Sequence, residues 1–341
     1  MDMSPFPWLR DKPDTFQFHL ENDTGDFETY TRKKRMELGE SLLKLRRIYL
    51  DTKYWLYVRD VYLNRSNNPL HGEIVKELRR LRNSGSTICP VSYSIFSELL
   101  YQSDPVTRNA TAEMIDELSD GCTIQPPHEV FRRELIQFVK KMNSEGVELD
   151  EIEKLVWTKV VFILGDCFLS LEASPFAATH ALAIRKTMDD LLWSINLSEM
   201  LCQWPFLDRN KQESNLELAE SLTDGKFEHQ KQSDTFEKLF LDEVKGGLEN
   251  YITILGEFAL QLGIKNGLEA KLSQSEIIDL GKMFAIQIWG AFKYKRICTE
   301  LPSVSIPSSL HAAIRLDKKR KYKKGDFEDI HHAALAVPYF D

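Results

Sequence analysis

The chain has 341 residues, of which 43% are hydrophobic and 28% charged, and its 44 Lys and Arg against 52 Asp and Glu give a formal net charge of −8. This composition is that of an ordinary globular protein and excludes collagen-like, intrinsically disordered and disulfide-scaffold classes. At about 150 residues per domain, the length predicts two domains, or one domain with a large insertion.

The cysteines and the apolar runs bear on the cellular location. The five cysteines are odd in number and widely spaced, without a Cys-x-x-Cys pair or zinc-ligand spacing. The N-terminal stretch has acidic residues and prolines where a signal peptide needs a basic and then an apolar run. The longest apolar run, Val160 to Leu164, is far shorter than the roughly 20 residues that span a bilayer. We therefore predict a soluble, cytoplasmic protein with reduced thiols and no membrane partner.

Short strands and helices are expected to alternate in the first third of the chain. A polar N-terminal extension, 1–45, ends in a predicted helix from about Tyr30 to Leu45. Three apolar segments then have the β-branched and aromatic residues of strands, at 47–51, 87–91 and 122–124. Helices are expected between them, over 54–63, 72–82, a span capped by Ser92, and 107–118. This alternation predicts a parallel sheet, whose ligands bind at the carboxyl ends of the strands.

From about 128 to 300 the apolar spacing is helical, and no strand is predicted. Helices are expected over 131–142, 149–171, 178–204, 235–262 and 276–299. The polar stretch 203–232 is predicted to be a solvated linker or loop. We therefore expect a helical bundle in this part of the chain.

Three carboxylates lie next to apolar segments, a placement that is not expected for residues of an ordinary solvated surface. Asp51 ends an apolar strand, Glu98 lies on an otherwise apolar helix after the next strand, and Asp329 precedes another apolar helix together with Asp326. Carboxylates that converge at one sheet edge suit Mg²⁺ or Mn²⁺, and two such ions activate a water and stabilise both oxygens of a phosphodiester displacement. A helix cap or a surface charge is the competing interpretation for each acid, except at Asp51, where a strand-terminal acid between apolar segments is costly unless it is paired.

Three segments, in this chain order, resemble a PIN-domain nuclease, specifically a divergent PIN-like protein. They are IYLDTKYW around Asp51, CPVSYSIFSELL around Glu98, and GDFEDIHHAALAVPYFD around Asp329 and Asp341. The resemblance implies an α/β fold, with a three-layer α/β/α core and a parallel sheet, whose acidic cluster binds divalent metal and hydrolyses phosphodiester bonds, usually in RNA.

The resemblance also implies roles for single residues. Asp51 would be the first metal ligand, with Thr52 beside it as a supporting hydroxyl, and Glu98 would be the second ligand. Asp329 would be the third, and Asp326 either shares that role or caps the helix.

The domain boundaries follow from the same resemblance. Residues 46–135 and 305–341 would form the core, interrupted by an all-helical insertion at 136–304. Asp341 is either a fourth catalytic acid or the first residue of a further strand. Because relatives continue into that strand, the last strand of the core is expected to be absent from this chain.

Positive charge is concentrated immediately before Asp326 and Asp329. Seven cations are opposed only by Asp317: Arg315, Lys318, Lys319, Arg320, Lys321, Lys323 and Lys324. Positive charge beside acids is expected where a polyanion is held while metal ions act, and Tyr322 can stack on a base. The competing interpretations are a solvated helix face and a nuclear-import-like run. We favour phosphate binding.

The sequence therefore predicts a metal-dependent nuclease, an endoribonuclease acting on single-stranded RNA or, as the other substrate, single-stranded DNA. Its cofactor would be Mg²⁺ or Mn²⁺. The alternative is a catalytically degenerate PIN-like interaction module whose helical insertion binds a partner protein or a second copy. His331 and His332, close to Asp329, are candidates for metal binding or proton transfer, against the alternative of partly buried, hydrogen-bonded histidines.

Overall fold

The computed structural model describes residues 12–22, 25–143, 151–166, 180–202, 211–228, 235–265, 267, 271–295 and 297–341. The chain forms two compact units. The first comprises Met1–Glu129, Asp150–Leu207 and Tyr339–Asp341, and the second comprises Val130–Leu149 and Asp208–Pro338.

The predicted three-layer α/β/α core with a parallel sheet is wrong. The structure is 72% helix and 4% strand, and the described residues hold only two two-stranded sheets. In one, β1 (Arg46–Arg47) pairs in parallel with β2 (Thr87–Ile88). In the other, β3 (Cys122–Ile124) pairs antiparallel with β4 (Trp157–Lys159). A single parallel bridge joins Val91 to Thr123.

Local chemistry explains why the strands are so short. Pro90 lacks a backbone N–H and therefore cannot donate to the ladder within the predicted strand 87–91. The predicted strand 47–51 gives way at its end to a helix that begins at Thr52. Only the prediction at 122–124 matches a strand at both ends.

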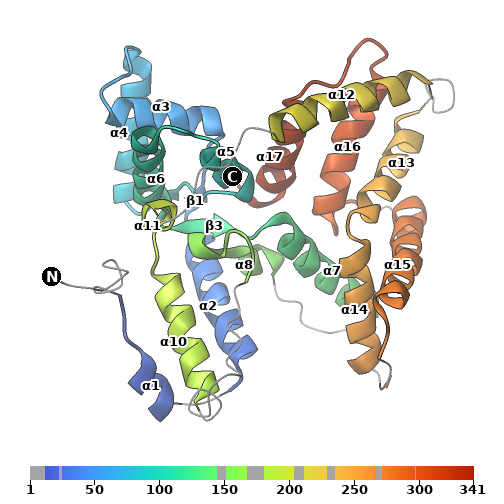
Figure 1. Ribbon diagram of the computed structural model, residues 1–341, viewed down its shortest axis with the longest axis horizontal. Coiled ribbons are helices and arrows are strands. Elements are labelled where there is room, and N and C mark those ends of the chain that lie inside the picture. The colour runs from blue at the N-terminus through green and yellow to red at the C-terminus, as the bar shows by residue number, and fades with distance from the viewer. Residues whose placement is uncertain are drawn as a thin grey trace. The chain divides into compact units, whose positions relative to one another are not determined.

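The helices of the first unit are mostly those that apolar spacing predicts (Figure 1). Ser92 caps its helix as expected, since its hydroxyl accepts from the backbone N–H of Ile95 at 3.5 Å. The helices are α1 (Phe16–Glu21), α2 (Phe27–Leu42), α3 (Thr52–Tyr62), α4 (Pro69–Asn83), α5 (Tyr93–Leu100), α6 (Pro105–Ser119), α8 (Ile152–Leu155), the 3₁₀ helix η2 (Val160–Phe162), α10 (Ala181–Trp193) and α11 (Leu197–Cys202).

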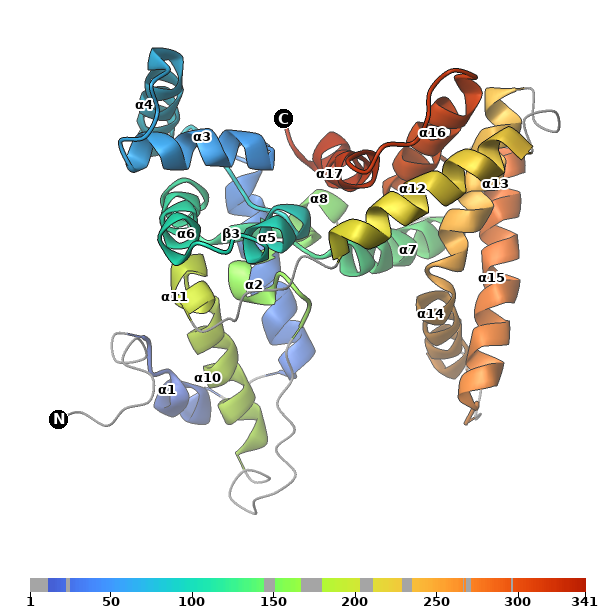
Figure 2. The same ribbon diagram turned by 45° about the horizontal axis from the view of Figure 1, so that its top comes forward.

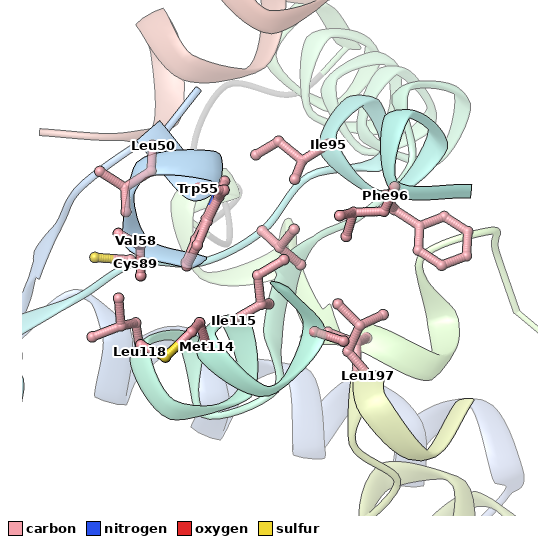
Figure 3. Packing of buried hydrophobic residues seen from close by; sticks show 14 of the residues in the cluster. Leu50, Trp55, Val58, Cys89, Ile95, Phe96, Met114, Ile115, Leu118 and Leu197 are labelled. Carbon is pink, nitrogen blue, oxygen red and sulfur yellow. The ribbon is translucent and has the colours of Figure 1, made fainter. Parts of the chain in front are cut away.

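Apolar side chains from α3, α5, α6 and α11 form the core of the first unit (Figure 3). Leu50 directly precedes Asp51, and Leu99 directly follows Glu98; both leucines belong to this core. Close packing around them therefore fixes the backbone that carries the two acids. The labelled members are Leu50, Trp55, Val58, Cys89, Ile95, Phe96, Met114, Ile115, Leu118 and Leu197.

The second unit is all-helical in its described residues, and α7 (Pro127–Asn143) runs into it from the first. α14 packs on α15, and α13 packs on both α15 and α16 (Figures 1 and 2). The remaining helices are α12 (Lys211–Glu228), α13 (Phe236–Glu249), α14 (Ile252–Lys265), α15 (Gln274–Lys295), α16 (Pro302–Leu316) and α17 (Asp326–Tyr339).

Three predictions on the helical part need correction. The single helix predicted over 149–171 is wrong, because α8, β4 and η2 occupy its described residues. The predicted linker 203–232 is helical over Lys211–Glu228. The apolar stripe 235–262 is divided between α13 and α14 at Asn250 and Tyr251. Among the described residues, none of the helices has the length and apolar character needed to cross a membrane.

Candidate functional site

Asp51 and Glu98 both affect the pKa of Tyr49. Burial raises the pKa of the Tyr49 phenol, and the negative charges of Asp51 and Glu98 each raise it further. The hydroxyl of Tyr49 lies 2.9 Å from that of Ser92, the cap of α5. Asp51 and Glu98, which follow β1 and β2 in the chain, thus both raise the pKa of one buried phenol.

Asp51 is the N-cap residue of α3, but it does not act as a side-chain cap. Its backbone is extended (φ −60°, ψ 155°), its side chain makes no cap hydrogen bond, and the residue is exposed. The hydroxyl of Thr52 is buried and finds no hydrogen-bond partner among the described residues. A buried polar atom normally has a partner, so an acid and an unsatisfied hydroxyl stand side by side at the start of α3.

Glu98 lies in the second turn of α5 and is partly buried. Its neighbours Phe96, Leu99 and Leu100 are in the apolar core. Packing of these apolar side chains therefore fixes the position of the helix backbone that carries Glu98.

Asp341 is held by Arg47 of β1. Its carboxylate accepts from the backbone N–H of Arg47 at 2.8 Å and from the Arg47 Nε at 3.1 Å. In return, the backbone N–H of Asp341 donates to the carbonyl oxygen of Arg47 at 2.9 Å. These hydrogen bonds lower the pKa of the Asp341 carboxyl group. The side chain proposed as a fourth catalytic acid is thus engaged with the backbone and side chain of β1.

Asp326 and Asp329 belong to the second unit, at the start of α17. Asp326 is buried and accepts from the Arg320 side chain and from the backbone N–H of Lys323, both at 2.9 Å. These two hydrogen bonds hold the loop before α17 to the first residue of that helix. Asp329 is exposed on the first turn of α17.

The basic segment is an irregular loop between α16 and α17, except that Arg315 lies in α16. Arg315 is ion-paired with Glu243 of α13. Five of the other six cations are exposed: Lys318, Lys319, Arg320, Lys321 and Lys323. The loop therefore presents a positive surface, and like charges crowded in this way favour an anionic ligand.

The side chain of Lys226 in α12 holds this loop through hydrogen bonds to backbone carbonyl groups. Its ammonium donates to the carbonyl oxygens of Ile314 and Asp317, at 2.8 and 2.5 Å, and to that of Arg320. Burial lowers the pKa of Lys226. Lys226 is not identified as a structural residue from the sequence, because a linker is predicted here. A lysine in a polar stretch does not indicate by itself that its amine will donate to carbonyl groups about 90 residues away.

The two histidines next to Asp329 differ in exposure. His332 is buried, whereas His331 is exposed. Within the part of the chain that the structure describes, no group of three or more His, Cys, Asp and Glu side chains is arranged to hold a metal ion. Mg²⁺ is commonly held by one or two carboxylates, with waters and substrate phosphates completing the shell.

Comparisons with protein-family models, with curated proteins and with solved structures find no match. What the protein does is therefore inferred from the residues described above.

Proposed function

We propose that the protein is a metal-dependent nuclease that cleaves single-stranded RNA, with Asp51 and Glu98 as ligands of Mg²⁺ or Mn²⁺. The observation that carries this proposal is that Asp51, at the start of α3, and Glu98, in the second turn of α5, both raise the pKa of Tyr49. The local resemblance around both acids to PIN-domain nucleases supports the same chemistry.

The chain's own residues have separate tasks in this proposal. Asp51 and Glu98 supply the hard oxygen ligands, and the hydroxyl of Thr52 supports Asp51. When bound, the ion supplies an activated water and neutralises charge on the phosphodiester. In the second unit, the exposed cations at 318–323 bind RNA phosphates by neutralising their charge.

The experiment is cleavage of labelled single-stranded RNA and DNA by the full-length protein with Mn²⁺, with EDTA as the metal-free control. Asp51→Asn and Glu98→Gln should each reduce the cleavage rate by roughly 100-fold or more, because each removes an anionic ligand that stabilises the transition state. Glu73→Gln changes an exposed acid of α4 in the same unit and should cleave like the wild type. Wild-type rates in a folded Asp51→Asn protein would reject the proposal.

A second candidate function is self-association through the helical unit. A groove of about 550 Å³ between α13, α14 and α15 is lined by Leu248, Ile252, Ile286 and Trp289, with both charge signs at Lys282 and Glu249. Ile286 is 67% exposed and Met283 beside it 62%. Such an apolar face with mixed charges can pair with a second copy across a twofold axis.

Light scattering at increasing protein concentration tests this second candidate. A dimer that Ile286→Lys converts to a monomer is expected. A monomer at all concentrations contradicts it.

A further inference from the structure

A cavity of about 500 Å³ lies within the second unit, among α12, α13, α16, α17 and the basic loop. One face of α16 forms a long wall, with Ser303, Pro307, His311 and Arg315 at intervals of four residues. Tyr322 of the basic loop lines the cavity as well. Its volume is in the range of pockets that hold small organic ligands.

Three glycines open this cavity. Gly246 and Gly247 lie within α13 and Gly225 lies within α12, where each costs up to about 1 kcal/mol relative to alanine. A Cβ added at Gly225 or Gly246 would meet nothing within 4 Å, and one at Gly247 would meet only the Ser308 hydroxyl, at 3.7 Å. Packing within the unit therefore does not require these glycines, whereas the close approach of a ligand to the backbone would.

The charges around the cavity favour an anion. With the histidines counted as neutral, the charged lining residues are Lys226 and Arg315 against Glu243, a net charge of 2 − 1 = +1. The ion pair of Arg315 and Glu243 is partly accessible, with the two side chains 22% and 21% exposed. Tyr322 continues into the exposed cations of the loop, so positive charge extends from the cavity to the surface.

The remaining lining groups suit a flat body with hydrogen-bonding edges. Tyr322 stacks on Phe327, with ring planes 3° apart, and its hydroxyl lies 3.2 Å from Nδ1 of His311. Asn250, Ser308 and the Glu243 carboxylate add donors and acceptors. A nucleotide combines such a planar body with a negative phosphate, and this cavity lies beside the run of exposed cations of the basic loop.

We propose that this cavity binds a nucleoside monophosphate unit, with the base beside Tyr322 and His311 and the phosphate toward Arg315 and the basic loop. The unit comes either from free nucleotides or from one nucleotide of a single-stranded RNA. The RNA source rests on the proposed function, whereas the free nucleotide does not.

The test is calorimetric titration of the full-length protein with AMP, GMP, CMP and UMP, in EDTA so that no metal-dependent cleavage occurs. At least one should bind with a Kd below about 1 mM, more tightly than inorganic phosphate. Gly246→Met places a side chain in the cavity and should weaken this binding at least about tenfold. Gly290→Met is the matched control, since Gly290 is also helical and open within 4 Å but does not line the cavity.

The anisotropy of a fluorescein-labelled, eight-nucleotide RNA distinguishes the two sources. If Gly246→Met weakens binding of this RNA, the cavity takes a nucleotide of the strand; if it weakens only the monophosphates, the cavity takes free nucleotides. Equal affinities of the Gly246→Met and Gly290→Met proteins for both probes would overturn the proposal. Circular dichroism checks the fold, and Gly225→Leu fills the same cavity from α12 if Gly246→Met does not fold.

The outcomes separate this proposal from the proposed function. A protein that binds monophosphates through the cavity but does not cleave RNA keeps the binding site and rejects the nuclease. Cleavage that depends on Asp51, with identical binding by the two glycine variants, keeps the nuclease and rejects the binding site.

Discussion

At the scale of single residues, Asp190 of α10 shows how a network of donors holds a carboxylate ionised. Its oxygens lie 2.7 Å from the Thr15 hydroxyl and 2.8 Å from both the Lys34 ammonium and the His19 ring, and they accept from the Tyr30 hydroxyl. Burial by itself would raise the pKa of Asp190, but these hydrogen bonds outweigh it and lower the pKa from 3.8 to about 2.

Asp190→Asn is therefore expected to destabilise the protein in a pH-dependent way. Because the pKa is lower in the folded state, the stabilisation by Asp190 is fully present above the unfolded value near 3.8 and is lost as the pH falls through about 2. After allowance for partial exposure, the difference from the wild type is about 1–2 kcal/mol at neutral pH. Urea unfolding of both proteins between pH 2 and 7 measures it, and a difference that does not shrink toward acid pH would contradict the assignment.

The thiols are a second prediction at this scale. Burial raises the pKa of Cys89 to about 12 and that of Cys122 to about 11, whereas Cys202 and Cys298 are exposed. Since only the thiolate reacts, iodoacetamide at pH 8 should modify Cys202 and Cys298 in the native protein and the two buried thiols only after unfolding. Peptide mass spectrometry reads this out, with the urea-unfolded protein as control; rapid native labelling of Cys89 would refute it.

At the scale of elements, two glycines allow α14 and α15 to cross in close contact. A Cβ at Gly256 would lie 2.0 Å from the carbonyl oxygen of Ile277, and one at Gly281 would lie 2.0 Å from that of Ile252. These distances are far inside van der Waals contact, so only glycine fits at either position. The two helices therefore approach backbone to backbone at this point.

Gly281→Ala should destabilise the second unit by roughly 1–3 kcal/mol, because the added methyl group must push the helices apart. Gly290→Ala, on the same helix, meets nothing within 4 Å and should be neutral or stabilising by up to about 1 kcal/mol through helix propensity. Thermal melts followed by circular dichroism compare the two variants. The crossing described here is incorrect if their melting temperatures change equally.

Helix ends show the limit of local sequence signals at this scale. Ser92 caps α5 from the residue just before the helix, as the sequence predicts, and Asp104 caps α6 in the same way. The N-terminus of α16 has no side-chain cap of its own. Instead, the fully buried Glu134 of α7 accepts from the Ser303 backbone N–H at 3.0 Å and from its hydroxyl at 2.8 Å. This cap comes from 169 residues away and leaves no local pattern.

At the scale of the whole molecule, metal binding should be visible as stability. An ion that binds only the folded chain raises the free energy of unfolding by about 2.7 kcal/mol at 100 times its Kd. We therefore expect Mn²⁺ to raise the melting temperature of the wild type and of Glu73→Gln but not that of Asp51→Asn. Scanning calorimetry with a Mn²⁺ series measures the shift, and an equal shift in Asp51→Asn would place the ion elsewhere.

The sequence by itself determined the elements whose information is local. Apolar residues three and four apart identified most helices, and the helix predicted over 54–63 corresponds to α3. These signals suffice because helical hydrogen bonds and the periodicity of a buried face involve neighbours in the chain. Local signals do not determine how many strands pair or how long the paired segments are. Three strand-like segments therefore predicted an α/β core that the structure does not have.

Only the tertiary structure decided what depends on residues far apart. It paired β4 with β3, gave Asp51 and Glu98 a shared effect on the pKa of Tyr49, and bonded Lys226 to the carbonyl groups of the basic loop. It also placed three glycines at the wall of a cavity, whereas in the sequence these glycines indicate only low helix propensity. The physical reason is that strand pairing, buried hydrogen bonds and close helix crossings draw their energy from partners that the local pattern does not specify.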